Sequence, residues 1–293
     1  MKKSLTTRTI LLLFGAIPFR WRRALFRALL LCYYHFSSKH RMITFNNLLH
    51  AFPEKDLLEI TKIAKNVFLN LGTVTAEFFE IPSLTKDNMS SWVTFEGLEN
   101  YERAREKNQG VLFYTAHFGN WELLAACCGL QNIIVTIVYR ALDNPILENF
   151  VAWFRSFTGH KLLPKGGASQ RIVESLKNNE MVGVLIDQNV FWHEGVFVDF
   201  LGRPASTTKR FAELALRTGA PVLSAFIIRK EDGTYRIVFN EEVKLSRTGD
   251  HDRDLFENTQ RFTNIIEDVV RRYPDQYFWL HQRWKTKQYE MGK

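Results

Sequence analysis

The sequence has 293 residues, of which 46% are hydrophobic and 24% are charged. This is the composition of a globular protein with enough apolar material for a large core. Its three cysteines, Cys32, Cys127 and Cys128, have neither CxxC nor metal-site spacing, which argues against a disulfide framework and for a reducing compartment. The net charge of +8 favours anionic partners: nucleic acid, lipid headgroups, phosphorylated sugars or an acidic carrier protein.

The N-terminus combines apolar and basic residues. An apolar run over residues 10–19 contains Pro18 and is too short to span a bilayer as a straight helix. Arginines rather than a small-x-small cleavage site follow it, which argues against a signal peptide. Residues 23–36 are predicted to form a helix with basic and apolar aromatic side chains, a combination typical of a membrane interface. We therefore predict that residues 1–40 form a helical membrane-associating segment; the alternative is a helix packed on its own domain.

Hydrophobic periodicity predicts alternating helices and strands along the rest of the chain. The predicted helices cover residues 53–79, 121–130, 147–157, 169–177, 209–217 and 257–272. The predicted strands cover residues 111–116, 133–139, 181–186, 222–228, 235–239 and 277–280. The first strands are nearly continuous runs of Val, Ile, Leu and Phe, as expected for strands buried on both faces of a parallel sheet. We therefore predict one α/β domain over residues 41–293, with a layered, mostly parallel sheet flanked by helices.

Polar side chains follow three of the predicted strands. His117 and Glu122 follow the first strand, Arg140 ends the second, and Asp187 follows the third. In open α/β sheets, ligands bind beyond the carboxyl ends of the strands. We therefore expect these four residues to lie at one edge of the sheet and to form an active site there.

The segment from His117 to Glu122 is the most informative part of the sequence. Two residues five positions apart on one helix diverge, so these side chains can meet only if the helix begins near Asn120. Gly119 permits the sharp turn, and Asn120 is a suitable N-cap. Glu122 then lies in the first helical turn, where the helix dipole favours a carboxylate. We predict that Glu122 hydrogen-bonds one imidazole nitrogen of His117 and leaves the other free as a base.

The same segment resembles a known family. HFGNWE at residues 117–122 is similar to the HxxxxD/E signature of the lysophospholipid acyltransferase superfamily. Its NWE ending is typical of the branch that contains the bacterial lipid A late acyltransferases, the lauroyl and myristoyl transferases. Further similarity lies, in order, in residues 46–54, 138–145, 166–171, 187–188, 195–205 and 277–285, so it covers nearly the whole chain. Two features depart from the family pattern: the basic N-terminal segment is short, and residues 199–202 read DFLG.

This resemblance implies the glycerolphosphate and lysophospholipid acyltransferase fold. It also implies transfer of a fatty acyl group from a thioester, usually on acyl carrier protein, to a hydroxyl of a membrane glycolipid such as a lipid A precursor. Coenzyme A is the alternative carrier. His117 would be the general base and Glu122 would orient it, with no cofactor and no metal. The expected location is the cytoplasmic face of the inner membrane, with acyl carrier protein and the anionic membrane surface as partners.

Five further roles in binding the substrate or the oxyanion follow. The resemblance places Arg140 and Asp187 in the active site. Arg140 would bind a phosphate or the oxyanion, and Asp187 would hold Arg140 or a lipid sugar; a structural salt bridge is the alternative for both. Backbone N–H groups near Gly119 and Asn120, at a helix start, are candidates for stabilising the oxyanion. Arg171 is a candidate phosphate ligand, or else part of a solvated helix face.

Two other classes of function are disfavoured. A basic, aromatic-rich chain is compatible with nucleic-acid binding, but the sequence lacks helix-turn-helix, RNP and zinc-module signatures and its basic residues are dispersed. A serine hydrolase on an α/β sheet would need a G-x-S-x-G elbow, and the nearest sequence, around Ser169, does not match it. Within the acyltransferases, the alternative acceptor is another glycolipid or phospholipid, such as a phosphoinositol mannoside or an ornithine-type lipid.

Overall fold

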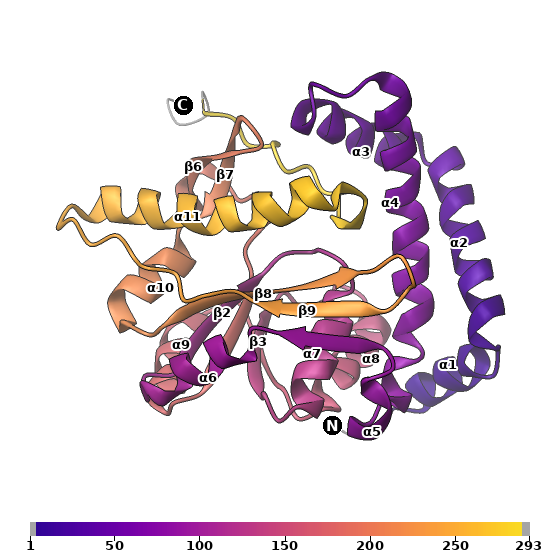
Figure 1. Cartoon of the computed structure of the whole chain (residues 1–293), viewed down its shortest axis with the longest axis horizontal. Helices are drawn as coiled ribbons and strands as arrows, with labels where there is room; N and C mark the ends of the chain where they lie inside the picture. Colours follow the sequence, from indigo (N-terminus) through magenta and orange to yellow (C-terminus); the bar gives the residue numbers. More distant parts are fainter. Residues whose placement is uncertain (1–3, 289–293) are drawn as a thin grey trace.

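The apolar runs of the sequence form a seven-stranded sheet in the computed structural model, which describes residues 4–288 (Figure 1). Strands β8, β2, β5, β3 and β4 run parallel to one another, whereas β9 pairs antiparallel with β8 and parallel with β1. The predicted α/β fold with a mostly parallel sheet is therefore confirmed. In spatial order the strands are β1 (Val93–Glu96), β9 (Tyr235–Phe239), β8 (Val222–Arg229), β2 (Val111–Thr115), β5 (Met181–Leu185), β3 (Val135–Tyr139) and β4 (Lys161–Pro164).

In the described part of the chain, five α-helices precede the first strand, and the other helices connect or follow the strands and cover the sheet. The α-helices are α1 (Leu5–Gly15), α2 (Phe19–Phe36), α3 (Ser38–Ala51), α4 (Leu57–Phe78), α5 (Lys86–Met89), α6 (Leu98–Glu106), α7 (Trp121–Leu130), α8 (Pro145–Ser156), α9 (Ala168–Lys177), α10 (Arg210–Thr218) and α11 (His251–Arg272). The 3-10 turns are η1 (Ile81–Ser83), η2 (Trp192–Glu194) and η3 (Pro274–Gln276), and β6 (Gly195–Phe200) forms an antiparallel hairpin with β7 (Arg203–Thr208).

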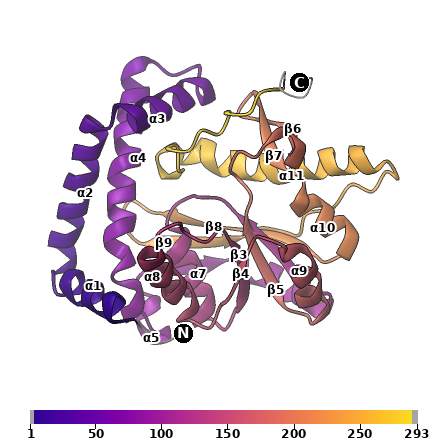
Figure 2. The same ribbon diagram turned by 180° about the vertical axis from the view of Figure 1, so that it is seen from behind.

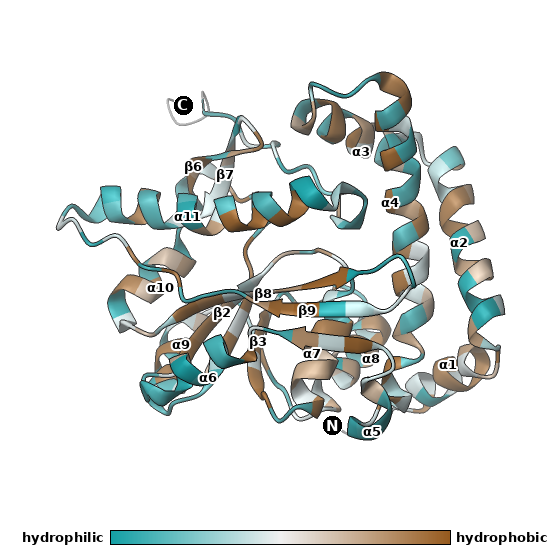
Figure 3. Cartoon of the chain, viewed as in Figure 1, coloured by the Kyte–Doolittle hydropathy of each residue, from teal (hydrophilic) through white to brown (hydrophobic). Residues whose placement is uncertain are grey.

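The central strands are apolar throughout because both faces of the sheet are covered. In β2, Leu112 and Tyr114 join a core with α9, α10 and α11, whereas Val111 and Phe113 join a second core with α6, α7 and α8. All four side chains are buried. Figure 3 accordingly shows hydrophobic colour in the central strands and hydrophilic colour along the outer parts of α6 and α11. Two-sided burial removes the alternation that a half-exposed strand would show.

The N-terminal helices stand together at one side of the sheet, as both ribbon views show (Figures 1 and 2). The fully buried Arg22 of α2 fastens this group. Its Nη1 donates to the carbonyl of Phe14 at the end of α1 (2.8 Å), and its Nε donates to the carbonyl of Ala76 in α4 (3.1 Å). It also forms an ion pair with Glu80. Most of the predicted segment 1–40 thus has a defined place; residues 1–3 lie outside the described residues.

Within residues 4–288, no helix is both long enough and apolar enough to cross a bilayer.

The predicted elements match the structure best where periodicity is strong. The helix at residues 121–130 and the strand at 235–239 have the predicted bounds. The strand predicted at 277–280 is wrong: only an isolated bridge joins Tyr277 to Phe118, because this segment pairs with the loop after β2 instead of a strand. The short strands β1 and β4, the β6–β7 hairpin and helices α3, α5 and α6 were not predicted.

A core substitution tests this two-sided burial. Leu112 is fully buried in the central strand, so Leu112→Ala should lower the free energy of unfolding by about 2–5 kcal/mol through lost transfer energy and a cavity. Leu58→Ala on α4 is the matched control, because Leu58 is 79% exposed and its loss should stay within about 0.5 kcal/mol. Urea unfolding followed by circular dichroism measures both, and equal losses would contradict the assigned core.

Candidate active site

The loop between β2 and α7 is shaped by a glycine and an N-cap, as predicted. Gly119 has φ +58°, and a Cβ at this position would lie 2.0 Å from the backbone oxygen of Ile227 in β8. Only glycine therefore fits. Asn120 caps α7, since its Oδ1 accepts the backbone N–H of Leu123 (3.0 Å). The loop thereby turns within a few residues and leaves His117 at the carboxyl end of β2.

Asp187 holds the imidazole of His117. Its Oδ1 lies 2.9 Å from Nδ1 of His117, and its Oδ2 accepts the backbone N–H of His117 (3.1 Å). Asp187 follows β5, the neighbour of β2 in the sheet, and is only 4% exposed. An ionised carboxylate can only accept hydrogen bonds, so Nδ1 carries the proton and Nε2 is the basic nitrogen.

Glu122 has a different partner from the one that we predicted. Arg155 of α8 donates to its carboxylate from Nε (3.0 and 3.1 Å) and from Nη2 (2.5 Å). The predicted hydrogen bond between Glu122 and His117 is therefore corrected: Asp187 takes the imidazole, and Glu122 binds the guanidinium. The physical reason is that β5 places Asp187 directly beside the strand end, while the first turn of α7 directs Glu122 toward α8.

The charges around His117 favour its protonated form. Burial alone would lower the pKa of His117, but the carboxylate of Asp187, followed by that of Glu122, raises it above its ordinary value. Burial would likewise raise the pKa of Asp187, yet the neighbouring His117 brings it below its ordinary value. The pair therefore forms an ion pair readily once the imidazole takes up a proton.

The basic nitrogen of His117 lies on the accessible side of the site. The His117 side chain is 23% exposed, and the Nε2 of the exposed Gln188 lies 3.5 Å from its Nε2. The ring of Trp121 meets the imidazole edge-on with a centroid distance of 5.2 Å, and that of Phe278 lies 6.1 Å away. Two aromatic rings and an amide thus surround a base that solvent can reach.

The C-terminal segment supports both strand ends. Phe278 donates its backbone N–H to the carbonyl of His117 (2.9 Å). The Nε2 of His281 accepts the backbone N–H of Asn189 (2.9 Å) in the loop that follows Asp187. Burial lowers the pKa of His281 to about 4, so this imidazole is neutral near pH 7 and remains an acceptor. The role of this segment is to hold the two loops that carry the His–Asp pair.

The structure does not place the remaining predicted residues against His117. The Arg140 side chain is 70% exposed at the end of β3 and pairs with Asp143 (3.1 Å), so the predicted pairing of Arg140 with Asp187 is wrong. Asp187 is occupied by His117 instead. The side chain of Arg171 is exposed on α9 and has no hydrogen bond or ion pair to another described residue. Arg140 shares the carboxyl edge of the sheet with His117, because β3 and β2 both run parallel to β5, which lies between them.

The predicted oxyanion donors at the turn are partly occupied. The backbone N–H of Gly119 donates to the carbonyl of Gln276 (2.8 Å) and is not free for a substrate. Asn120 is fully buried, and its side chain is used within the protein. The backbone N–H groups of Asn120 and, in the first turn of α7, of Trp121 and Glu122 have no acceptor among residues 4–288. Of the two predicted donors, only Gly119 is therefore occupied, and the first turn of α7 adds two unpaired N–H groups to that of Asn120.

Sequence reasoning missed Arg155 and the part played by Gln188. Arg155 lies 33 residues after Glu122 on another helix, so no local spacing connects the two. Gln188 was noted only as part of the similarity at residues 187–188, and a strand-end position was the single signal that pointed to it.

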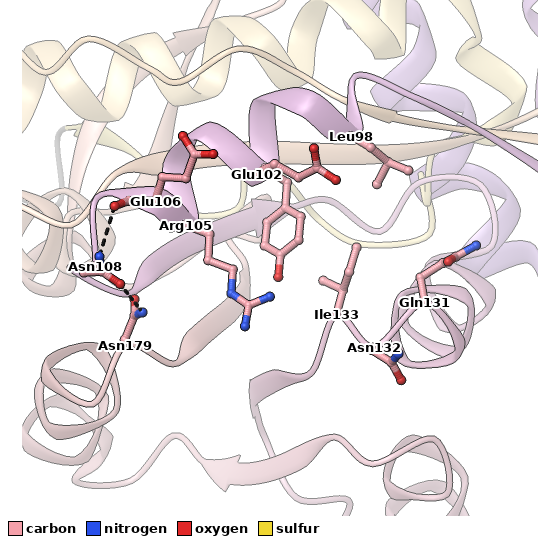
Figure 4. Close-up of a pocket in the computed structure, with 10 residues that line it drawn as sticks. Leu98, Glu102, Arg105, Glu106, Asn108, Gln131, Asn132, Ile133 and Asn179 are labelled. Carbon is pink, nitrogen blue, oxygen red and sulfur yellow. Dashed lines mark hydrogen bonds between the residues drawn. The ribbon is translucent and has the colours of Figure 1, made fainter.

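The pocket drawn in Figure 4 lies at the opposite edge of the sheet. It has a volume of about 590 Å³ and is lined by α6 and by loops that immediately precede β2, β3 and β5. Figure 4 shows Arg105 and Glu102 of α6 above it, and Asn108 hydrogen-bonded to Asn179 (3.0 Å) at its rim. Its position at the amino ends of the strands separates it from the His117 site.

Comparisons with known proteins cover the same region. A family model described as bacterial lipid A biosynthesis acyltransferase matches residues 6–286. A lipid A biosynthesis palmitoleoyltransferase of Escherichia coli (strain K12) is 28% identical over 255 residues, 86% of this chain and 81% of that protein. A lipid A biosynthesis lauroyltransferase of the same strain is 27% identical, with the same shares of both chains covered. A phosphatidylinositol mannoside acyltransferase of Mycobacterium tuberculosis (strain CDC 1551 / Oshkosh) is 24% identical over 159 residues, 52% of this chain and 50% of that protein.

Removing the carboxylate that holds the imidazole should shift its titration. In the wild-type protein we expect the pKa of His117 to lie above the ordinary value of about 6.5. In Asp187→Asn the opposing charge is gone while burial remains, so the pKa should fall below about 6.5. NMR titration of the His117 ring protons measures both values. An unchanged pKa in the variant would show that Asp187 does not interact with the imidazolium.

Proposed function

The chain belongs to the bacterial lipid A biosynthesis acyltransferase family and is therefore an acyltransferase, and we propose that it moves a fatty acyl group from acyl carrier protein to a hydroxyl of a lipid A precursor. The observation that carries this proposal is the His117–Asp187 pair at the carboxyl edge of the sheet, inside the region that the family model matches. The two relatives from Escherichia coli, named as lipid A palmitoleoyl- and lauroyltransferases, support the choice of acceptor.

In the proposed reaction, the acceptor hydroxyl attacks the carbonyl carbon of the thioester. The Nε2 of His117 takes the hydroxyl proton as the new C–O bond forms. Asp187 fixes the tautomer that leaves Nε2 basic and stabilises the imidazolium that results. The tetrahedral intermediate then expels the thiolate, which receives the proton from His117, so the imidazole returns to its neutral form. No cofactor enters this sequence beyond the thioester co-substrate.

We assign the stabilisation of the oxyanion to the start of α7 and to Arg140. The backbone N–H groups of Trp121 and Glu122 point from the positive end of a helix dipole, in the same short segment as His117. Arg140 is an exposed cation at this edge of the sheet, and its pairing with Asp143 is solvent-exposed and easily exchanged. It is suited to an oxyanion or to a phosphate of the acceptor.

Glu122 has an electrostatic part in this proposal. Its carboxylate is held by the guanidinium of Arg155, which fixes its position beside the imidazole. The negative charge of Glu122 raises the pKa of His117 and so favours the imidazolium that forms during the reaction. Glu122 therefore assists His117 through space, whereas Asp187 orients it through a hydrogen bond.

The membrane face that we propose is the outer side of α2. Trp21, Leu25 and Leu29 are exposed at intervals of four residues and thus share one side of this helix, and Phe36 at its end is 87% exposed. Exposed arginines at positions 20 and 23 accompany them. An exposed aromatic and apolar face together with basic side chains on the same helix suits the interface of an anionic membrane. The membrane-associating segment 1–40 would then lie on the cytoplasmic face of the inner membrane, beside a catalytic domain of residues 41–293.

The acyl donor and the acceptor lipid of the proposed reaction each have one alternative. The net charge of +8 supports an acidic carrier protein as the source of the acyl group, with a coenzyme A thioester as the other source. The similarity to a phosphatidylinositol mannoside acyltransferase keeps a different glycolipid as the second candidate acceptor, although it covers only about half of each chain.

The acyl-transfer proposal is tested by mass spectrometry of the lipid product. Purified protein, acyl carrier protein loaded with a fatty acid and a lipid A precursor should yield the precursor with one added acyl mass. His117→Ala should lower the rate by about 10²–10⁴-fold, because the general base is lost. His251→Ala is the control, since His251 is exposed at the start of α11. Full activity of His117→Ala would refute the mechanism, and an acyl gain only on another lipid would replace the acceptor.

The membrane proposal is tested by sedimentation with vesicles of anionic phospholipid. The triple variant Trp21→Glu, Leu25→Glu and Leu29→Glu should lower the partition coefficient by at least about tenfold. It removes apolar area that the proposed contact buries in the membrane, and it adds negative charge. The control is Phe256→Glu on α11, where the side chain is 45% exposed and lies outside α2. Equal binding by the triple variant and the wild-type protein would exclude α2 as the membrane face.

A further inference from the structure

Glu77, in the last turn of α4, is a buried carboxylate outside the active site described so far. The residue is 1% exposed, yet its oxygens accept hydrogen bonds from three other elements. The donors are Nδ2 of Asn120 (2.9 Å), the hydroxyl of Tyr235 in β9 (2.5 Å) and both terminal nitrogens of Arg229 in β8, one of them at 3.0 Å. Burial removes the water that hydrates a carboxylate, which costs free energy, and these donors replace the lost hydrogen bonds.

The contact with Asn120 determines how the catalytic turn is capped. A carboxylate can only accept, so Glu77 requires the Nδ2 end of the Asn120 amide. The Oδ1 end is thereby directed to the backbone N–H of Leu123, which is the N-cap bond of α7. Asn120 stands three residues after His117 and immediately before the first helical turn. Glu77 thus selects the orientation of the side chain that begins α7.

The other side of the turn is fastened to the same group of residues. The carbonyl of Gln276 accepts the backbone N–H of Gly119 (2.8 Å). The side chain of Gln276 accepts the N–H of Arg229 (2.8 Å) and donates to its carbonyl (3.0 Å). Arg229 in turn donates to Glu77. Gly119 and Asn120 are therefore held from two sides by one continuous chain of hydrogen bonds, whose centre is the Glu77–Arg229 pair.

We propose that Glu77 is a positioning residue for acyl transfer: through Asn120 it fixes the turn that sets His117 and the first N–H groups of α7 relative to each other. This inference rests on the proposed role of His117 as the base. An apolar contact would join α4 to the sheet at a lower desolvation cost, whereas a carboxylate also dictates the orientation of its donors. Displacement of a catalytic group by about 1 Å can lower a rate about 100-fold, so the precision of this turn affects turnover.

Two single variants break the link from opposite ends. Glu77→Asp keeps the charge that pairs with Arg229 but shortens the reach toward Asn120. Asn120→Ser keeps an oxygen for the N-cap but removes the Nδ2 donor. Each should lower kcat by about 10–100-fold, with KM nearly unchanged because the substrate contacts remain. The double variant should be no slower than the slower single variant, because both lose the same interaction.

A stability control separates positioning from folding. Asn258 of α11 is also fully buried, and its side chain makes hydrogen bonds to the backbone of Ser246 and Asp254. Asn258→Ala should lower the melting temperature and leave kcat, measured well below that temperature, unchanged. Glu77→Gln adds a second control: it keeps the length and one acceptor oxygen for the Nδ2 of Asn120 but leaves Arg229 without its counter-charge. It should therefore be less stable than Glu77→Asp and yet have the higher kcat.

The outcomes distinguish this inference from the function beneath it. If Glu77→Asp and Asn120→Ser keep the wild-type kcat while His117→Ala is inactive, the positioning role is wrong and the proposed function stands. If the losses in kcat multiply in the double variant, or follow the melting temperatures across the series, the link between Glu77 and Asn120 does not position the turn. If His117→Ala keeps full activity, the proposed function itself fails.

Discussion

The hydrogen bond between Asp187 and the Nδ1 of His117 is the interaction on which the rest of the site depends. It joins the ends of two adjacent parallel strands, β2 and β5, so the register of the sheet sets the distance between the two side chains. Asp187 also accepts the backbone N–H of His117, and therefore fixes the main chain as well as the ring. A base positioned by a rigid sheet loses little freedom when it reacts, which is the advantage of building it at strand ends.

Around this pair, each carboxylate forms an ion pair or hydrogen bond with a different cationic or imidazole side chain. Asp187 neutralises His117, Arg155 neutralises Glu122, and Arg229 neutralises Glu77. Asp187 and Glu122 thus both act on one imidazole without competing for its hydrogen bond. Since the pKa of His117 depends first on burial and then on Asp187, the more distant Glu122 changes its value without deciding its tautomer. Charge and geometry are in this way set by different residues.

The sequence predicted the fold and the turn but assigned the wrong carboxylate to His117. Gly119 and Asn120 act through contacts within a few residues, so the turn and its cap could be predicted from local chemistry. The choice between Glu122 and Asp187 depends on strand order, and β5 lies between β2 and β3 although β3 follows β2 in the chain. Periodicity gives no strand order, because a crossover helix can return the chain to either neighbour. The contact of Arg155, on a helix that packs beside α7, could not be predicted for the same reason.

Helix α4 connects the two functional surfaces that we propose. Along its length it packs against α2, which carries the proposed membrane face, and Arg22 of α2 donates to the carbonyl of Ala76. The next residue, Glu77, holds the cap of α7. Consecutive residues of one helix therefore fasten the membrane-facing layer and the catalytic turn. A helix of 22 residues is stiff over this span, so the orientation of His117 relative to the outer face of α2 is set by the fold before any lipid arrives. For an enzyme whose acceptor lies in a bilayer, this fixed orientation reduces the entropy lost when the acceptor hydroxyl meets the base.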